Sequence, residues 1–232
     1  METICITGAS RGIGLGFARA YLDAGSRVFA CVRNPNAEQL QLLASSYPDR
    51  LEIIEVDVSN GESVDRGCAE VRRRADTLDI LINNAGIAPE PNETSIDDVD
   101  EEAIRRVFNV NTLGPVRVTK ALFPLLRRSK NGRVVMIGSS AGSIAMQGGG
   151  RGVPYCVSKA ALNMLTRLLY FHCRDEGVAI TSLHPGWVRT DMGGDRGNLS
   201  VEESVSQMRK QISALNAESP VYMDYKGEAM PW

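Results

Sequence analysis

The sequence predicts an α/β fold in which a parallel, doubly wound sheet of seven strands carries helices on both faces. Short apolar runs alternate with longer amphipathic stretches along the 232 residues. The runs are nearly continuous rather than alternating in polarity, which is typical of parallel strands covered on both faces. Repeated strand–helix alternation favours a single sheet with right-handed crossovers. We therefore expect one domain over 1–232, with a Rossmann-type strand order of 3-2-1-4-5-6-7.

The elements follow one another in a regular order along the chain. Strands are expected at 4–6, 28–32, 51–56, 78–82, 134–137, 178–183 and, on the weakest pattern, 221–222. Helices are expected at 12–24, 37–46, 61–75, 99–129, 155–175 and 201–216. In such a sheet a ligand binds beyond the carboxyl ends of the strands, at the point where the strand order reverses. The residues that directly follow each run are therefore the candidates for a functional site.

Composition excludes several classes of partner. Apolar residues make up 43% and charged residues 23%, an ordinary balance for a folded domain. The net charge of -2 and the absence of a basic cluster argue against a nucleic-acid partner. Five cysteines without a C-x-x-C pair predict reduced thiols and a cytoplasmic protein. We expect no signal peptide, no membrane span and no metal site.

The first strand–helix junction carries a glycine-rich turn with the spacing Gly8-x3-Gly12-x-Gly14. Glycines there allow tight turning and close approach of the backbone to a pyrophosphate, which the following helix N-terminus attracts. A plain strand–helix connection is the alternative, but the position at the first junction favours nucleotide binding. The residues assigned to the cofactor at this turn are Gly8, Ser10, Arg11, Gly12, Ile13 and Gly14.

The end of the second expected strand indicates which dinucleotide binds. An NAD(H) site usually places an acid there for the ribose 2′-hydroxyl, whereas this chain has Arg33. A guanidinium suits a 2′-phosphate, and Arg11 offers a second one. Two ordinary surface arginines are the alternative. Together they favour NADP(H) over NAD(H).

Tyr155 and Lys159 form the expected catalytic pair. Their i, i+4 spacing places them on one face of a helix, one turn apart. A free phenol has a pKa near 10, and a neighbouring ammonium should lower it, so that the tyrosine can exchange protons. Ser139 and Ser140, directly after the fifth expected strand, can bind a substrate oxygen.

These motifs together resemble the short-chain dehydrogenase/reductase family across the whole chain. The matching segments are TGASRGIG at 7–14, Asp57-Val58, NNAG at 83–86, Asn111, Ser140, YCVSK at 155–159 and HPG at 184–186. LHPGWVRTDMGG at 183–194, SVEESV at 200–205 and the ending DYKGEAMPW resemble the sniffer-type carbonyl reductases and the bacterial C-factor proteins. The resemblance implies a homodimer or homotetramer that transfers hydride between NADP(H) and a small carbonyl or alcohol.

The resemblance also implies roles for individual residues. Tyr155 would donate the proton, Lys159 would hold the nicotinamide ribose, and Ser140, in preference to Ser139, would orient the carbonyl. Further cofactor contacts are implied for Asp57, Val58, Asn83, Ala85, Gly86, Pro185, Gly186, Val188 and Thr190. Ser140 precedes Tyr155 by 15 residues, a slightly longer separation along the sequence than is usual in the family. The loop 142–154 is therefore expected to shape the pocket differently.

Asn111 is a further catalytic candidate with an argument of its own. Pro115 lacks an N–H, so a helix that runs through it leaves the carbonyl of Asn111 without its partner, and such a carbonyl readily holds a water. In the family this asparagine completes a proton relay to solvent through a water. A simple Gly-Pro helix break is the alternative.

The substrate itself is not determined by the sequence. The segments 88–98, 142–154 and 187–200 are expected to line its pocket, with the glycines of 191–200 as hinges of a closing loop.

Two rival functions remain open. Residues 138–142 also read G-x-S-x-G, and Asp175 and His184 follow in the chain order of a hydrolase triad around Ser140. Against this, the glycine-rich segment after Ser140 disfavours the helix that a nucleophile elbow needs, and we expect His184 to pack or to bond the backbone. The other rival is a C-factor-like signalling or NADP(H)-sensing protein with little turnover.

Overall fold

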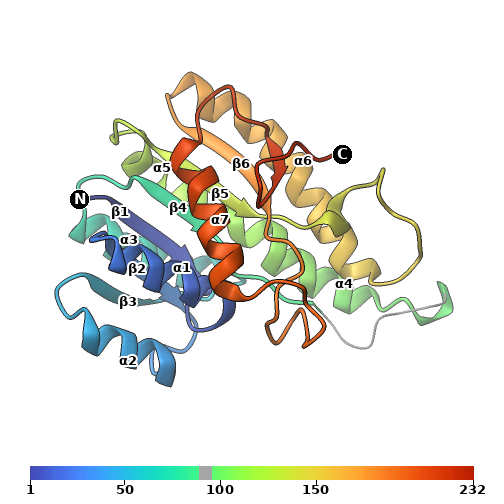
Figure 1. Ribbon diagram of the computed structural model, residues 1–232, viewed down its shortest axis with the longest axis horizontal. Helices are drawn as coiled ribbons and strands as arrows, with labels where there is room; N and C mark the ends of the chain where they lie inside the picture. The colour runs from blue at the N-terminus through green and yellow to red at the C-terminus, as the bar shows by residue number, and fades with distance from the viewer. Residues whose placement is uncertain (89–95) are drawn as a thin grey trace.

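The computed structural model describes residues 1–88 and 96–232, and these form a three-layer α/β structure around one sheet (Figure 1). Seven strands pair in parallel in the order β3-β2-β1-β4-β5-β6-β7. Their bounds are β1 Thr3–Thr7, β2 Arg27–Val32, β3 Leu51–Glu55, β4 Ile80–Asn83, β5 Arg133–Ile137, β6 Ala179–His184 and β7 Tyr222–Asp224. The predicted fold class and strand order are confirmed.

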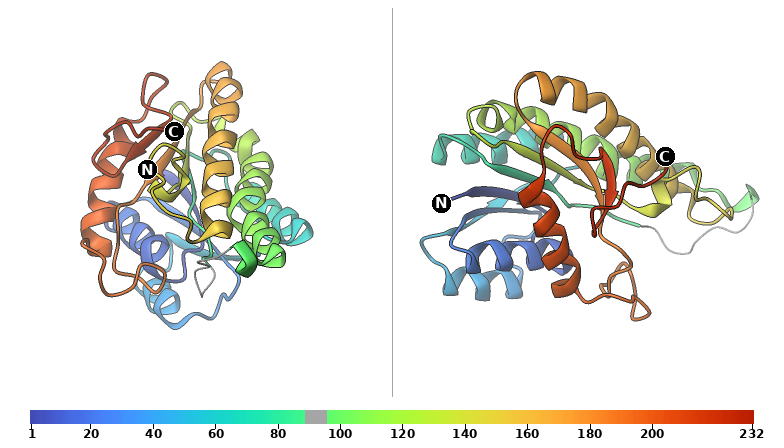
Figure 2. Two further views of the ribbon diagram at one scale, coloured as in Figure 1. Left: turned by 90° about the vertical axis from the view of Figure 1, so that its right-hand side faces the viewer. Right: turned by 45° about the horizontal axis from the view of Figure 1, so that its top comes forward.

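Helices cover both faces of this sheet, as Figure 2 shows in its end-on view. Their bounds are α1 Gly12–Asp23, α2 Glu38–Ser46, α3 Gly61–Arg74, α4 Glu101–Phe108, α5 Gly114–Leu126, α6 Val153–Asp175 and α7 Val201–Ala214. Helices α1, α2 and α7 pack on one face, and α3, α5 and α6 pack on the other. Short 3-10 turns occur at Ile96–Asp98 and Ser140–Gly142.

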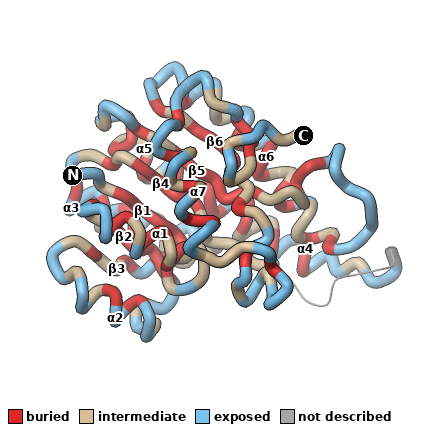
Figure 3. Tube along the Cα trace, viewed as in Figure 1, coloured by how far each residue is buried: buried red, intermediate tan, exposed pale blue. Residues whose placement is uncertain are grey.

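Two apolar cores, one on each face, explain why the strands read as continuous apolar runs. In β1, Ile4 and Ile6 face α1 and α7, whereas Cys5 faces α3 and α5. Successive side chains of a strand point to opposite faces, so each residue is buried on its own side. The buried trace through the centre of Figure 3 follows these strands.

The helix predicted at 99–129 is interrupted where the proline argument places a disturbance. Helix α4 passes into a π-helical turn at Asn109–Leu113, and the N–H of Gly114 donates to the carbonyl of Asn109, five residues back. Pro115 then occupies the first turn of α5, where its missing N–H matters least. The chain therefore continues through the proline by widening one turn.

The carboxyl ends of β1, β4, β5 and β6 meet at one edge of the sheet. At this edge lie the turn after Thr7, the segment after Asn83, the serines after Ile137 and the segment after His184. The sheet thus brings together motifs that are far apart in the sequence. Of the predicted pocket segments, residues 89–95 lie outside the described part of the chain.

Candidate active site

The glycine turn after β1 is built so closely that side chains are excluded from it. Gly8 and Gly12 have φ of 66° and 53°, a region that favours glycine. A Cβ on Gly8 would lie 2.8 Å from the Cα of Ala85, and one on Gly14 would lie 2.3 Å from the carbonyl oxygen of Gly8. The turn, the start of α1 and the segment after β4 are therefore packed backbone against backbone.

The start of α1 fits the phosphates of a dinucleotide. Among the described residues, no side chain caps this helix, whose preceding residue, Arg11, is extended. Its first N–H groups and the positive end of the helix dipole are therefore available to an anion. Thr190 borders the same turn, since its Cγ2 would lie 3.4 Å from a Cβ on Gly12. The predicted cofactor residues of 8–14 and Thr190 thus share one place.

The two arginines predicted to select the cofactor have different surroundings. Arg11 pairs with Asp191 at 2.5 Å, and both side chains are exposed. Arg33 is exposed at the end of β2 and makes no ion pair or side-chain hydrogen bond within the described residues. The charge of Arg33 instead affects the pKa of Asp57. Partial burial raises the pKa of Asp57, but hydrogen bonds from Ser59 and the charge of Arg33 outweigh burial and bring that pKa below its ordinary value.

Of the adjacent Asn83 and Asn84, the second rather than the predicted first reaches the glycine turn. Asn83 was expected to contact the cofactor, but its side chain is buried and donates to Thr119 Oγ1 at 3.0 Å, between β4 and α5. Asn84, which the sequence reasoning missed, donates from Nδ2 to the carbonyl oxygens of Thr7 at 2.9 Å and Gly8 at 3.2 Å. Asn83 is the last residue of β4 and faces the core, whereas Asn84 is the first residue after the strand and reaches the glycine turn.

Tyr155 and Lys159 lie together in the first turns of α6, as their spacing predicts. The Nζ of Lys159 is 5.6 Å from the centroid of the Tyr155 ring. Lys159 is only 5% exposed, and its ammonium donates to the carbonyl of Ile137 at 2.7 Å, at the end of β5. The helix and the strand end are thus joined through Lys159.

The pKa values of this pair differ from the expectation that the ammonium lowers the pKa of the phenol. Burial raises the pKa of Tyr155, and a hydrogen bond with Ser139 offsets only part of that rise. Burial also lowers the pKa of Lys159, to about 8. Removing both groups from water disfavours their charged forms, and this is the largest cause of both shifts in pKa. At neutral pH Tyr155 is therefore a protonated phenol.

Ser139, rather than Ser140, is the serine that meets the phenol. The side chain of Ser139 is hydrogen-bonded with Tyr155 and accepts from the N–H of Ala141 at 3.1 Å. Ser140 begins the 3-10 turn, and its N–H donates to Nδ1 of His184 at 3.2 Å. The contacts therefore differ from the predicted preference for Ser140. Spacing alone does not reveal this choice, because it depends on packing: a Cβ on Gly142 would lie 2.7 Å from the backbone of Lys159.

Asn111 lies in the π-helical turn and is buried. Its Oδ1 accepts from the N–H of Ile87 at 2.9 Å, and its Nδ2 donates to the carbonyl of Ile87 at 2.9 Å and to Ser158 Oγ at 3.0 Å. A Cβ on Gly86 would lie 3.4 Å from Oδ1 of Asn111. Asn111 thus joins the segment after β4 to the helix of Tyr155, and its place in a proton relay stays a prediction.

The segment predicted as a closing loop is tied at its base. Val188 and Leu199 form a bridge, and the N–H of Arg189 donates to the carbonyl of Leu199 at 2.9 Å. Beyond this base, Trp187 Nε1 donates to the carbonyl of Gly193 at 2.8 Å. The Arg11–Asp191 pair then links the loop to the glycine turn, so loop and nucleotide turn are in direct contact.

Comparison with known proteins identifies the family of this fold and site. The family model described as short chain dehydrogenase matches residues 2–198. The chain belongs to the short-chain dehydrogenase family. It is 43% identical over 156 residues to C-signal of Myxococcus xanthus, which covers 67% of this chain and 93% of that protein. An oxidoreductase of Schizosaccharomyces pombe is 31% identical, with 98% of this chain and 96% of the relative covered.

Solved structures agree with this membership. The carbonyl reductase Sniffer of D. melanogaster superposes with a TM-score of 0.95 and 32% identity, and covers 100% of both chains. The NADPH-bound carbonyl reductase from chicken fatty liver gives a TM-score of 0.92 and 35% identity over 100% of this chain and 99% of that one. This short-chain dehydrogenase is accordingly an oxidoreductase.

The hydrolase alternative does not fit the dehydrogenase site. The serines are followed by a single 3-10 turn rather than by the helix that a nucleophile elbow requires. His184 accepts from the N–H of Ser140, which is the backbone contact that we predicted for it. Asp175 ends α6 and precedes β6, whereas His184 ends β6, so the two lie at opposite edges of the sheet.

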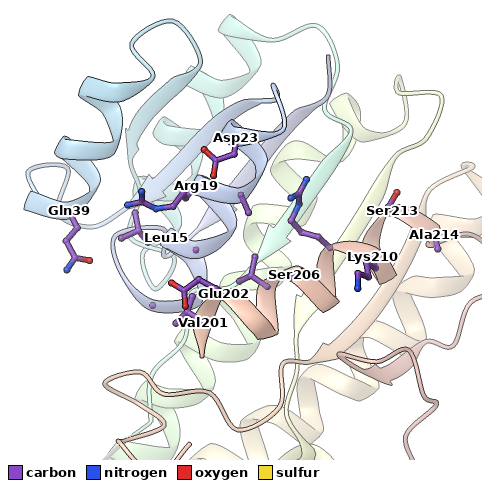
Figure 4. A pocket seen from close by; sticks show the side chains of 15 residues that line it. Leu15, Arg19, Asp23, Gln39, Val201, Glu202, Ser206, Lys210, Ser213 and Ala214 are labelled. Atoms are coloured by element: carbon purple, nitrogen blue, oxygen red, sulfur yellow. The ribbon is translucent and has the colours of Figure 1, made fainter. Parts of the chain in front are cut away.

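A hollow of about 920 Å³ lies away from this chemistry, between α1 and α7 (Figure 4). Its lining is Gly12, Leu15, Gly16, Arg19, Ala20, Asp23, Gln39, Val201, Glu202, Val205, Ser206, Arg209, Lys210, Ser213 and Ala214. Charged side chains of both signs line it, and neither Ser139 nor Tyr155 belongs to it.

Two features are absent from residues 1–88 and 96–232. No helix in this part of the dehydrogenase combines the length and the apolar character needed to cross a bilayer. In the same residues, His, Cys, Asp and Glu side chains do not gather in groups of three or more that could hold a metal ion.

Proposed function

We propose that this short-chain dehydrogenase is an NADP(H)-dependent reductase of small carbonyl compounds that uses Tyr155 as its proton donor. The observation that carries the proposal is the meeting of Ser139, Tyr155 and Lys159 at the sheet edge where α1 also begins with its N–H groups uncapped by any described side chain. Two hydroxyls that can bind one oxygen meet there, at the same edge of the sheet as the turn that we propose holds phosphates. A carbonyl oxygen can be held there while it gains negative charge.

The residues of this site divide the chemistry among them. Ser139 and Tyr155 bind the substrate oxygen, and Tyr155 gives up its proton as charge develops on that oxygen. Burial raises the pKa of Tyr155, so the phenol is protonated at neutral pH and ready to donate. Hydroxyl donors fixed in a site of low dielectric stabilise the developing charge strongly. Lys159 supplies a cation beneath the phenol, which favours its anionic form once the proton has left.

A nicotinamide cofactor supplies the hydride when it is bound. The turn 8–14 would hold its phosphates, Lys159 its nicotinamide ribose, and residues 185–190 would cover the nicotinamide. Asp57, Val58, Ala85 and Gly86 remain proposed contacts of the adenosine half. The glycines of 8–14 leave room for a backbone approach that a Cβ would block, so the residues present fit the group.

The test of this function is NADPH consumption across a panel of aldehydes, ketones and quinones. Tyr155→Phe should lose at least a hundredfold in kcat while keeping its affinity for NADPH, because general acid catalysis contributes roughly 10²- to 10⁴-fold. Ser139→Ala should lose more than Ser140→Ala, its matched neighbour. Turnover by Tyr155→Phe at the wild-type rate would refute the assignment, and equal losses in the two serine variants would refute the choice of Ser139.

The preference for NADP(H) over NAD(H) rests on Arg33. Its exposed guanidinium, at the end of β2 and without an ion pair in the described residues, suits a 2′-phosphate. Arg33→Ala should weaken NADPH binding about tenfold and leave NADH binding unchanged, since hydrogen bonds to charged groups contribute about 1.5 kcal/mol or more. Arg66→Ala, which changes an exposed arginine of α3, is the control. An equal loss for both cofactors would contradict the preference.

Self-association is proposed through α6. Exposed apolar side chains at Val157, Met164, Leu168 and Phe171 follow one another at helical spacing along this helix. A stripe of this kind is typical of a surface covered by another copy. A homodimer or homotetramer is expected in light scattering. Met164→Glu should shift the mass towards the monomer, and an unchanged mass would count against this face.

Signalling is the second candidate function, favoured by the 43% identity to C-signal. The variant Tyr155→Phe separates it from reduction. A protein that acts only by binding NADP(H) would keep its biological output in this variant, whereas a reductase would lose it.

A further inference from the structure

The turn that carries Ser139 is held in place by buried polar side chains from three elements. Asn163 of α6 donates to the carbonyl of Gly142 at 3.1 Å, and Ser182 of β6 donates to Oδ1 of Asn163 at 2.6 Å. The hydroxyl of Tyr222, in β7, donates to the carbonyl of Ser139 itself at 2.7 Å. All three side chains are at most 2% exposed. Hydrogen bonds from buried side chains thus hold the turn at both ends, at Ser139 and at Gly142.

Tyr222 has a position that no motif described above includes. It lies beyond residues 2–198, the part that the family model matches. Strand β7 pairs with β6 so that Tyr222 is beside Ser182, which brings its ring under the serine turn. Burial raises the pKa of Tyr222, and a hydrogen bond with Asn163 offsets part of that rise. The phenol therefore stays protonated and is a donor to the Ser139 carbonyl.

The residues after β7 hold Tyr222 and the turn together. The N–H of Met230 donates to the carbonyl of Tyr222 at 3.0 Å, which folds the segment back on the strand. The ring of Trp232 then lies 5.4 Å from that of Tyr222, centroid to centroid. The carbonyl of Trp232 accepts from the N–H of Ala145 at 2.8 Å. One segment, 222–232, thus contacts the chain at Ser139 and again six residues later.

We propose that Tyr222 is a positioning residue, which acts through Ser139 by fixing the backbone that carries the serine hydroxyl. The inference rests on the proposed function, in which that hydroxyl orients the substrate carbonyl. A hydroxyl that holds a reacting group must be placed within a fraction of an ångström, and small displacements reduce the rate strongly. The Ser139 carbonyl also accepts from the N–H of Gly142 at 2.9 Å, a bond within the turn itself, whereas Tyr222 ties that carbonyl to β7. Phenylalanine at 222 keeps the ring but removes the tie to β7, so the turn can rotate.

The experiment compares Tyr222→Phe with Tyr170→Phe. Tyr170 also donates to a backbone carbonyl, that of Ala217 at 3.0 Å, but at the surface near the far end of α6. Tyr222→Phe should lower kcat roughly tenfold, with unchanged affinity for NADPH and an unchanged circular dichroism spectrum. Tyr170→Phe should match the wild type. In a Ser139→Ala background, Tyr222→Phe should cause no further loss, because its effect passes through that serine.

Two results would overturn the inference. One is an unchanged kcat in Tyr222→Phe, and the other is a full additional loss in the Ser139→Ala background. A second measurement needs no turnover, so it separates this inference from the proposed function. In protein with ¹³C-labelled tyrosine Cζ, the Tyr155 resonance, assigned with Tyr155→Phe, should shift in Tyr222→Phe and not in Tyr170→Phe. If the protein has no reductase activity but shows this shift, the positioning role of Tyr222 is supported and the proposed function is refuted.

Discussion

The buried Lys159 should destabilise the folded chain at neutral pH. Burial lowers the pKa of Lys159 from 10.5 to about 8, a difference of about 2.5. At 1.36 kcal/mol for each pKa unit, the charged ammonium costs about 3 kcal/mol of unfolding free energy. Lys159→Met removes this cost and forfeits the hydrogen bond to the Ile137 carbonyl, worth about 1 kcal/mol. The variant without cofactor should therefore be more stable than the wild type by about 2 kcal/mol at pH 7.

The same linkage predicts how the difference changes with pH. Below about pH 8 the lysine is charged in both the folded and the unfolded chain, and the full cost applies. Between about 8 and 10.5 the unfolded chain binds more protons, so the stability of the wild type rises with pH. The advantage of Lys159→Met should shrink to about zero by pH 10, where its relief and its lost hydrogen bond nearly cancel.

Urea unfolding of the cofactor-free proteins from pH 7 to pH 10 measures this difference. Lys210→Met, at an exposed position of α7, is the control and should stay within about 0.5 kcal/mol of the wild type. A difference for Lys159→Met that does not vary with pH would refute the argument. So would a variant less stable than the wild type at every pH, because burial of the charge would then not oppose folding.

Three further outcomes follow from the described contacts. Gly14→Ala should lose about 1–3 kcal/mol in thermal or urea unfolding and weaken NADPH binding, because its Cβ would lie 2.3 Å from the Gly8 carbonyl oxygen. Asp191→Asn should tighten NADPH binding up to about fivefold in titrations, by freeing Arg11 from an exposed ion pair worth at most about 1 kcal/mol; weaker binding would show that the pair assists the cofactor. In reduction, kcat/KM should decline above about pH 8, where Lys159 loses its charge while Tyr155 stays protonated. An alkaline limb above pH 9.5 would contradict that order.

The fold could be predicted because it depends on periodicity alone. Continuous apolar runs require cover on both faces, and cover on both faces together with alternating helices leaves one common topology. The break near Pro115 also followed from a local rule, since a missing N–H must be accommodated by its own turn. Its form did not, because a π-helical turn and a sharp kink satisfy that rule equally.

The sequence predicted which edge of the sheet carries the site, but two of the contacts there are made by the residue next to the predicted one. Asn84 in place of Asn83 and Ser139 in place of Ser140 are both shifts of one residue at a strand end. There the backbone leaves the strand, so the direction of each side chain depends on the turn that follows and on what packs against it. For the serines the packing is the close approach of Gly142 to the backbone of Lys159, which sequence spacing does not reveal.

The electrostatics of Tyr155 and Lys159 show why spacing can predict that two side chains meet without predicting the direction in which their pKa values shift. The i, i+4 relation fixes which side chains meet, and at a solvated surface their attraction would dominate. At this site the helix start lies against the end of β5, and the ammonium reaches the Ile137 carbonyl at 2.7 Å. Removal from water then opposes both charges at once, so the phenol keeps its proton and the lysine holds its own less firmly. That balance suits a site whose first task is to donate a proton to a carbonyl oxygen, because the neutral phenol is the donor and the cation matters only after the proton has moved.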